Sequence, residues 1–185
     1  VFSRSFVELR KLRPDVIFIG GDIVHSKTQG ISPELIHILT WWFNSLAEIA
    51  PVHVILGNHD GLMLNEDRLD AITPILEALD NPDIHLFKES GTYDIGVDGY
   101  KWNVFSCFDV KGWDDVEPDP SCINIATFHG PVNGSLTDQD WEINGDSVSV
   151  DFFDKFDFAF LGDIHKRQYL TPKIAYPGST IQQNY

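Results

Sequence analysis

Apolar residues occur along this chain in short runs, and several of these runs alternate with segments in which apolar residues recur at helical spacing. Short apolar runs are typical of strands that are buried on both faces of a parallel sheet. We therefore expect four buried strands, at residues 16–19, 52–56, 123–128 and 156–161. The segments with helical spacing predict helices at residues 5–13, from 33 to about 50, and at about 67–79.

Turn and cap residues mark the limits of some of these elements. Ser32 is suited to the N-cap and Pro33 to the first position of the second helix, and Pro51 ends it. Between the second and third buried strands the polar and apolar residues alternate, and Val97-Asp98-Gly99 has the composition of a hairpin turn. This alternation predicts shorter strands at 84–88, 92–96 and 101–108.

Strands that alternate with helices predict an α/β fold built in layers, in which ligands bind beyond the carboxyl ends of the strands. With 185 residues, of which 43% are hydrophobic, the chain is expected to form one globular domain over 1–185. No apolar run approaches the ~18 residues of a membrane span, so we expect no membrane association. The acidic stretch Trp113–Pro120 is expected to be an exposed loop.

The cysteines and the net charge indicate a cellular location and limit the kinds of partner that this chain can bind. Cys107 and Cys122 lie in hydrophobic surroundings, which indicates reduced thiols and favours a cytoplasmic location. The 28 acidic and 13 basic residues give a net charge of −15. This charge argues against a broad nucleic-acid-binding face made by these residues alone.

Side chains suited to metal binding follow the ends of the predicted buried strands. They are Asp22, Asn58, His129, Asp163 and His165. Carboxylate, amide and imidazole donors without thiolate suit Mn²⁺, Fe²⁺ or Zn²⁺. Each of these residues alone has an ordinary explanation, as a turn residue or a core histidine. Their recurrence at the same structural position is what indicates a metal site.

Other conspicuous residues have simpler explanations. His37, His53 and His85 stand in predicted helices or strands without a motif around them, and we interpret them as structural. The run Trp41-Trp42-Phe43 could serve as a base-stacking surface, but on a long amphipathic helix we expect it to belong to the core.

Four blocks of the sequence resemble signature blocks of calcineurin-like metallophosphoesterases. They are Gly21-Asp22, Gly57-Asn58-His59-Asp60, His129-Gly130 and Gly162-Asp163-Ile164-His165. The resemblance implies a layered metallophosphoesterase fold with central β-sheets flanked by helices. It also implies an enzyme that holds two divalent ions, Mn²⁺ first, with Mg²⁺, Fe²⁺ or Zn²⁺ as alternatives. The reaction would be hydrolysis of phosphate esters by a metal-activated hydroxide.

The same resemblance implies roles for individual residues. Asp22 would bridge the two ions, Asn58, His129 and Asp163 would complete one site, and His165 would serve the other. His59 would donate a proton to the leaving group or orient the phosphate. His25 would contact the phosphate, although a surface histidine in a loop is the ordinary alternative.

Two further segments resemble the SbcD branch of DNA repair nucleases, which includes phage relatives. These segments are Gly21–Ser26 and Tyr176–Tyr185. This second resemblance implies an exonuclease or endonuclease subunit that acts on DNA in the cytoplasm. An SMC-like ATPase of the SbcC type is the implied partner, and a homodimer is an assembly that the resemblance allows.

The sequence departs from the family pattern in two places. The first block, Asp-x-His, is absent before Val16, and we interpret the beginning of the chain inside a helix as truncation rather than evolutionary loss. Because that block supplies ligands to the site that His165 serves, we expect this chain to hydrolyse phosphodiesters poorly. Asp163 stands where the family usually has histidine, which favours Mn²⁺ or Mg²⁺ over softer ions. We also expect these residues to lack the C-terminal capping region of SbcD-type nucleases.

Two other functions remain open from the sequence. A phosphatase or cyclic phosphodiesterase acting on a small molecule would suit the acidic charge. A scaffold that keeps the fold without catalysis would suit the absent first block. His59 beside Asn58 argues against the scaffold, because a scaffold has no chemical need for a proton donor there.

Overall fold

The computed structural model describes residues 2–25, 30–65 and 68–181, and the chain forms two compact units, Val1–Phe87 and Lys88–Tyr185. The mixed α/β architecture that the sequence predicted is confirmed. The assignment of 1–185 to one domain stays a prediction. Within the described ranges, no helix has the length and apolar character that a membrane crossing requires.

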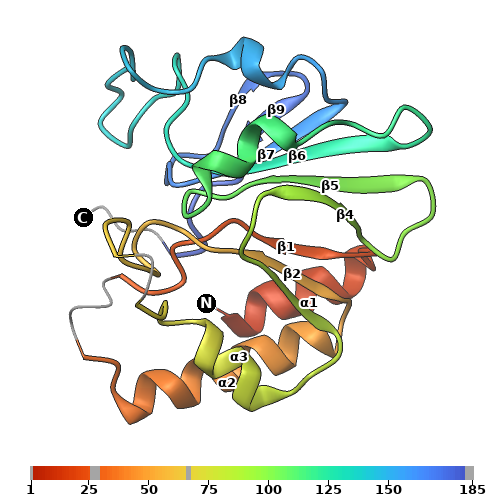
Figure 1. Ribbon diagram of the computed structural model, residues 1–185. Helices are drawn as coiled ribbons and strands as arrows, with labels where there is room; N and C mark the ends of the chain where they lie inside the picture. The colour runs from red at the N-terminus through yellow and green to blue at the C-terminus, as the bar shows by residue number, and fades with distance from the viewer. Residues whose placement is uncertain (1, 26–29, 66–67, 182–185) are drawn as a thin grey trace. The chain divides into compact units, whose positions relative to one another are not determined.

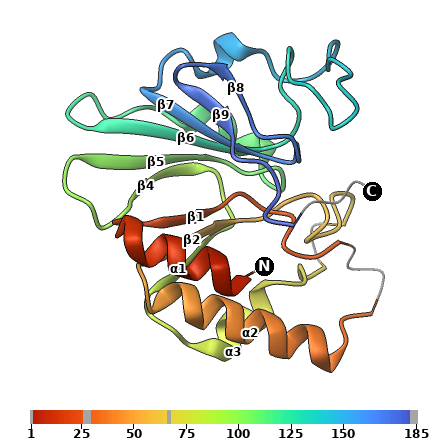
Figure 2. The ribbon, with the colours of Figure 1, turned by 180° about the vertical axis from the view of Figure 1, so that it is seen from behind.

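The first unit is a parallel three-stranded sheet with helices on one side (Figures 1 and 2). Its elements are α1 (Phe2–Leu12), β1 (Ile17–Ile19), α2 (Pro33–Ala47), β2 (Val52–Ile55), α3 (Thr73–Leu79) and β3 (Ile84–Phe87). The strand order is β1-β2-β3, and Phe18, His53 and His85 are aligned across it. The sheet therefore brings the carboxyl ends of β1 and β2 to one edge.

Helix α2 begins where the sequence predicted. The Ser32 side chain accepts a hydrogen bond from the amide of Leu35 at 3.2 Å, and Pro33 occupies the first turn. The core assignment of the aromatic run on α2 is only partly correct. Phe43 is fully buried, whereas Trp41 is 44% exposed and packs edge-on against Phe6 of α1. Helix α1 is thus held to α2 by ring contacts at its surface.

Helix α3 is shorter than predicted, because the start near residue 67 was wrong. The described residues 68–72 are not helical. The buried carboxylate of Asp70 accepts hydrogen bonds from the amides of Ile72 and Thr73 at 2.9 and 2.7 Å and from the Thr73 hydroxyl at 2.6 Å. This carboxylate satisfies amide groups that a helix start leaves without partners, and the helix begins at Thr73.

The second unit is built on a six-stranded sheet. Its strands are β4 (Gly91–Asp94), β5 (Tyr100–Phe105), β6 (Ile123–His129), β7 (Phe158–Gly162), β8 (Gln168–Thr171) and β9 (Ile174–Tyr176). Their order is β4-β5-β6-β7-β9-β8, with parallel central pairs and antiparallel pairs at both edges. The hairpin predicted at Val97-Asp98-Gly99 is confirmed, since β4 and β5 pair antiparallel around it. The strands β8 and β9 were not predicted from the sequence.

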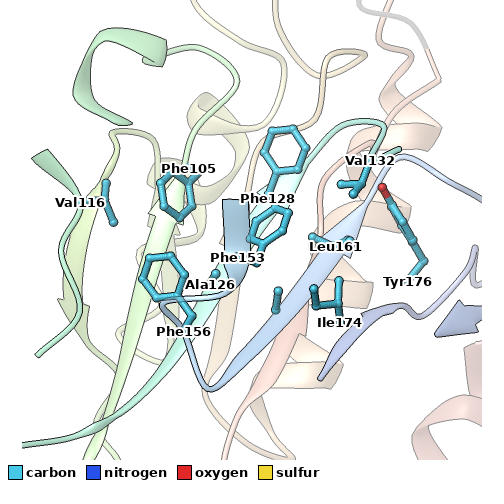
Figure 3. Close-up of a cluster of buried hydrophobic side chains, with 11 residues drawn as sticks. Phe105, Val116, Ala126, Phe128, Val132, Phe153, Phe156, Leu161, Ile174 and Tyr176 are labelled. Carbon is cyan, nitrogen blue, oxygen red and sulfur yellow. The ribbon is translucent and has the colours of Figure 1, made fainter. Parts of the chain in front are cut away.

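One face of this sheet carries the core of the second unit (Figure 3). Phe105, Phe128 and Phe153 pack there with Leu161 and Tyr176. Two short 3₁₀ helices, η1 (Val110–Asp115) and η2 (Val150–Phe153), contribute to it.

The acidic stretch predicted to be an exposed loop also contributes to this core. Within it, Val116 is fully buried, and the Trp113 indole donates a hydrogen bond to the carbonyl of Ser106 at 2.8 Å. The prediction of a simple exposed loop is therefore wrong for residues 113–116. Trp113 and Val116 flank the exposed pair Asp114-Asp115, so the apolar side chains reach the core while the carboxylates stay in solvent.

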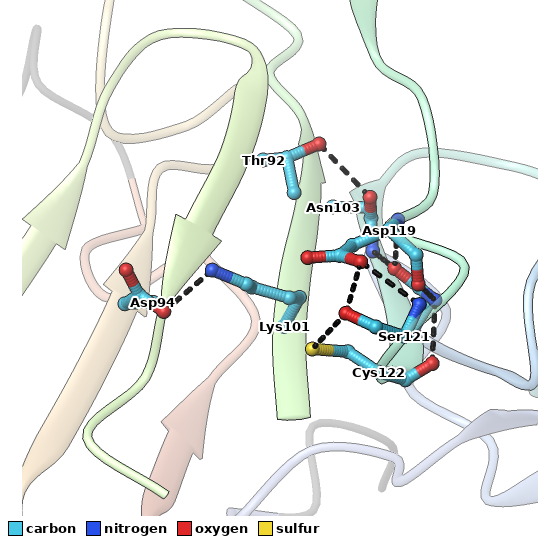
Figure 4. Close-up of polar contacts among 8 residues, drawn as sticks. Thr92, Asp94, Lys101, Asn103, Asp119, Ser121 and Cys122 are labelled. Atoms are coloured by element: carbon cyan, nitrogen blue, oxygen red, sulfur yellow. Dashed lines mark hydrogen bonds and ion pairs between the residues drawn. The ribbon is translucent and has the colours of Figure 1, made fainter. Parts of the chain in front are cut away.

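A polar network holds the segment that leads into β6 (Figure 4). Asn124 is buried, and its side-chain amide donates to the carbonyls of Asp119 and Cys122 at 2.7 and 2.9 Å. Ser121 hydrogen bonds lower the pKa of Asp119. Cys107 is buried, Cys122 is half-buried, and both are free thiols, so the predicted absence of a disulfide holds for these two residues.

Candidate metal centre

Two of the predicted ligands, Asp22 and Asp163, have backbone conformations that are uncommon for residues with a side chain. Asp22 follows β1 with φ of 53°, and Asp163 follows β7 with φ of 90°. Aspartate tolerates positive φ better than most residues, but such positions still cost on the order of 1–3 kcal/mol. Strained conformations of this kind concentrate at binding and active sites. Both carboxylates therefore stand where a site is expected.

In the first unit, the buried Asp60 joins the loop after β1 to the loop after β2. One carboxylate oxygen accepts from the amides of Ile23 and Val24 at 2.8 and 3.1 Å, and the other accepts from the amide of Gly57 at 2.8 Å. Asp60 has no exposed surface. The two loops that carry Asp22 and Asn58 are thus fixed to each other through one carboxylate.

Asp22 and His59 are directly linked. The amide of His59 donates a hydrogen bond to Asp22 Oδ1 at 3.0 Å. The His59 ring is exposed, stacks on His25 with 5.6 Å between ring centroids, and uses Nδ1 in a hydrogen bond to the His25 carbonyl oxygen. Because a carbonyl can only accept, Nδ1 carries the proton in this contact. Asn58 is exposed in the turn after β2.

In the second unit, strands β6 and β7 bring two predicted ligands together. His129 ends β6, is aligned with Gly162 of β7, and is 3% exposed. Its Nε2 lies 3.8 Å from Asp163 Oδ1. A buried imidazole beside a carboxylate gives two donor atoms at a separation that a single cation can bind.

Tyr176 supports the loop that follows β6. Its buried hydroxyl donates a hydrogen bond to the carbonyl of Gly130 at 2.8 Å. Burial, and then the negative charge of Asp163, raise the pKa of Tyr176 above its ordinary value. The hydroxyl therefore stays protonated and continues to donate at any physiological pH.

His165 lies in the loop after β7, and two segments hold it. The amide of Ser179 donates to its carbonyl oxygen at 3.0 Å, and its Nδ1 lies 3.5 Å from Asp138 Oδ2. The backbone and the ring of His165 thus have separate supports.

The structure groups the predicted site residues within each unit. Asp22, His25 and His59 are linked in the first unit, and His129 and Asp163 are adjacent in the second. The roles given to all seven residues stay predictions. Sequence reasoning missed Asp60, although it lies inside the block Gly57-Asn58-His59-Asp60. Nothing in the sequence pattern indicated that Asp138 would lie beside His165.

The donor set fits a hard or borderline divalent ion. Carboxylate oxygens come from Asp22 and Asp163, imidazole nitrogen comes from His129 and His165, and amide oxygen comes from Asn58. No cysteine lies among these blocks, and the donors are those that Mn²⁺, Mg²⁺, Fe²⁺ and Zn²⁺ accept.

Comparison with known proteins identifies a family that agrees with the candidate metal site. Residues 2–167 match the Metallophos family, calcineurin-like phosphoesterase. The chain is also similar to an uncharacterized protein of Acanthamoeba polyphaga mimivirus, with 36% identity over 201 residues that cover 100% of this chain. The chain spans 15% of the length of that relative. The family match spans nearly all of the first unit and most of the second, and we conclude that the chain belongs to the calcineurin-like phosphoesterase family, whose members are metal-dependent hydrolases.

Proposed function

We propose that this chain is the metal-binding core of an SbcD-type nuclease, which hydrolyses phosphodiester bonds in DNA. The observation that carries the proposal is the placement of the candidate residues. Blocks that contain ligand-type side chains stand at the carboxyl ends of β1, β2, β6 and β7, and His59 stands beside Asn58. The resemblance to SbcD also rests on residues 26 and 182–185, which lie outside the described residues.

In this proposal Asp22, Asn58, His129, Asp163 and His165 are the metal ligands. Bound divalent ions would lower the pKa of a water molecule and offset the charge that develops on the phosphate. Asp60 holds the loops of Asp22 and Asn58, and Tyr176 holds the loop after His129. Mn²⁺ is the proposed ion, because aspartate at position 163 is a harder ligand than the family's histidine.

His59 is the proposed proton donor. Its Nδ1–H is held by the His25 carbonyl oxygen, so the proton that passes to the leaving oxygen would come from Nε2 of the doubly protonated ring, which is left neutral. The His25 ring stacks on His59 and is exposed, so it is the proposed phosphate contact. The carbonyl of His25 thereby orients the same ring whose proton the reaction uses.

DNA is the proposed substrate, although the net charge of −15 opposes binding of a polyanion. We therefore propose that positioning of DNA depends on an SMC-like ATPase of the SbcC type, in the cytoplasm, and on pairing of two copies of the protein. The charge favours one other candidate, a phosphatase or cyclic phosphodiesterase for small molecules, which needs no extended contact with phosphates.

The experiment compares three substrates in the presence of Mn²⁺: linear duplex DNA, a p-nitrophenyl phosphodiester of thymidine, and p-nitrophenyl phosphate. Binding of a labelled phosphorothioate duplex, which resists cleavage, is measured in parallel by fluorescence anisotropy. For the chain without its proposed partner we expect weak, Mn²⁺-dependent binding of the duplex, and slow hydrolysis that is faster for the diester than for the monoester. Faster hydrolysis of the monoester without duplex binding would favour the small-molecule enzyme. Hydrolysis that is unaffected by chelators would overturn the proposal.

A further inference from the structure

A hairpin follows the loop after β6 and leaves the sheet of the second unit (Figure 2, teal to cyan). This element consists of residues 135–143 and is referred to below as the 135–143 hairpin. The amide of Ile143 donates to the carbonyl of Ser135 at 2.8 Å, and the amide of Thr137 donates to the carbonyl of Trp141 at 2.9 Å. Leu136 and Glu142 form an antiparallel bridge between its arms. The hairpin is therefore an ordered element with its own hydrogen bonds.

The 135–143 hairpin is anchored to the segment that carries His165. The amide of Leu136 donates to Gln168 Oε1, and Gln168 Nε2 donates back to the Leu136 carbonyl, both at 2.8 Å. Lys166 forms an ion pair with Asp140. The Gln168 side chain thus bonds both the amide and the carbonyl of Leu136, as the backbone of a neighbouring strand would. These two bonds set the position of the hairpin against the loop after β7.

This anchoring brings Asp138 to the ring of His165. Asp138 Oδ2 lies 3.5 Å from His165 Nδ1, which is an ion-pair contact slightly longer than the roughly 2.7–3.2 Å of an N–H···O hydrogen bond. Both side chains are partly shielded, with 27% and 38% of their surfaces exposed. The backbone of His165 is already held by Ser179 and Gly178, so rotation of the ring is the freedom that Asp138 can restrict.

We propose that Asp138 is a positioning residue that fixes His165 with the proton on Nδ1 and thus makes Nε2 the metal-binding atom. A carboxylate can only accept when ionised, so the neutral imidazole must present N–H toward it. Metal-binding histidines donate their second nitrogen in this way, which fixes the ring and raises the basicity of the ligand nitrogen. The inference rests on the proposed role of His165 as a ligand.

The ordinary alternative is a surface ion pair without a functional role, and the same hairpin supplies a comparison. Asp140 pairs with Lys166, one residue from His165, and its carboxylate is 74% exposed. Exposed pairs of this kind contribute little to stability. Replacement of Asp140 is therefore the matched control. Asp140 lies on the same hairpin, and its substitution by asparagine removes one negative charge at a residue that pairs with Lys166 and not with the imidazole.

The test uses three variants of the whole chain: Asp138→Leu, Asp138→Asn and the control Asp140→Asn. The tautomer of His165 is measured by ¹H–¹⁵N NMR correlations of the imidazole in metal-free protein, and Mn²⁺ affinity is measured by calorimetry. We expect Asp138→Leu to give a mixture of tautomers and to weaken Mn²⁺ binding about 10- to 100-fold. Asp138→Asn keeps an acceptor oxygen and should recover part of both losses. Asp140→Asn should leave both unchanged.

An unchanged His165 tautomer in Asp138→Leu would overturn the inference, and this readout needs no metal. Wild-type Mn²⁺ affinity in Asp138→Leu would also overturn it while leaving the proposed function intact. If the wild-type chain binds no Mn²⁺, the proposed function fails, and the tautomer measurement still decides the role of Asp138. Equal losses in Asp138→Leu and Asp140→Asn would mean that general charge, and not the contact with His165, is responsible.

Discussion

Gly178 lies directly against the backbone of His165. A side-chain carbon at Gly178 would lie 2.7 Å from the carbonyl oxygen of His165 and 2.9 Å from the amide nitrogen of Arg167. The next residue, Ser179, donates its amide to the same carbonyl at 3.0 Å. The segment after β9 is thus packed on the loop that follows β7, where two of the predicted ligands lie.

Replacement of Gly178 by alanine should therefore be costly. Its φ is +79°, and a methyl group there would also meet backbone atoms, which cannot move as a flexible side chain can. Gly99 has the same φ of +79°, and a side-chain carbon there would meet no atom of the described residues within 4 Å, so Gly99→Ala isolates the cost of the backbone conformation. We expect Gly99→Ala to lower the free energy of unfolding by roughly 1–2 kcal/mol. Gly178→Ala should lower it by about 1–3 kcal/mol more. Equal losses in urea denaturation would show that the contact with His165 is unimportant.

The second prediction concerns the link between the loops after β1 and β2. Asp60→Asn replaces one accepting oxygen by a donor and leaves a buried amide unpaired, at about 1–3 kcal/mol. Asp70 also accepts three hydrogen bonds in a buried position, at the start of α3, and Asp70→Asn is the control. Thermal denaturation should show similar losses for both. Calorimetry should show weaker Mn²⁺ binding for Asp60→Asn alone; equal affinities would mean that Asp60 only stabilises the fold.

The third prediction is a dependence of stability on pH. His53 is 2% exposed, and burial and then His85 lower its pKa from 6.5 to about 4. Between these values the unfolded chain binds a proton that the folded chain does not. The stability that the neutral, buried form of His53 allows is therefore fully present above about pH 6.5, and the free energy of unfolding decreases as the pH falls toward 4. Between pH 7 and 5 the loss should be on the order of 1–2 kcal/mol. Denaturation of His53→Gln at both pH values should show a smaller loss; an equal loss would assign the effect to other groups.

The fourth prediction concerns His59. Because its Nδ1 is held by His25 and its ring stacks on His25, we expect His59→Gln to keep Mn²⁺ bound. In a version of the protein that also carries an Asp-x-His block before Val16, the value of kcat on DNA should fall about 10²- to 10⁴-fold, as for loss of a general acid. A p-nitrophenyl diester, whose leaving group needs no proton, should recover part of the rate. Loss of Mn²⁺ in elemental analysis after dialysis would instead identify His59 as a ligand.

Much of the fold follows from local sequence patterns. The apolar runs before Asp22, Asn58, His129 and Asp163 form β1, β2, β6 and β7, and Ser32 caps α2 as its residue type predicts. The strands β8 and β9 escaped prediction because they are short and their register shifts between Tyr169 and Thr171. Their stability comes from pairing within the sheet, which local periodicity does not record.

Some residues of the candidate site could likewise be predicted from the sequence, whereas some of its contacts could not. Residues inside compact blocks, such as Gly57-Asn58-His59-Asp60, could be found because each block follows a strand. The contacts of Asp138 with His165 and of Tyr176 with Gly130 join residues 27 and 46 positions apart. Such contacts depend on how loops pack after the sheet has formed, and no pattern in the sequence carries that information.

The most direct test of metal binding is a calorimetric titration of the chain with Mn²⁺. Asp22→Asn and Asp163→Asn are the informative variants, because asparagine also tolerates positive φ and the substitution removes only the charge. Asp114→Asn, at an exposed carboxylate on η1, is the control. We predict that the wild-type chain and Asp114→Asn bind at least one Mn²⁺, and that Asp22→Asn and Asp163→Asn each bind it at least about 10-fold more weakly. Equal affinity in all four proteins, or no binding by the wild-type chain, would contradict the account.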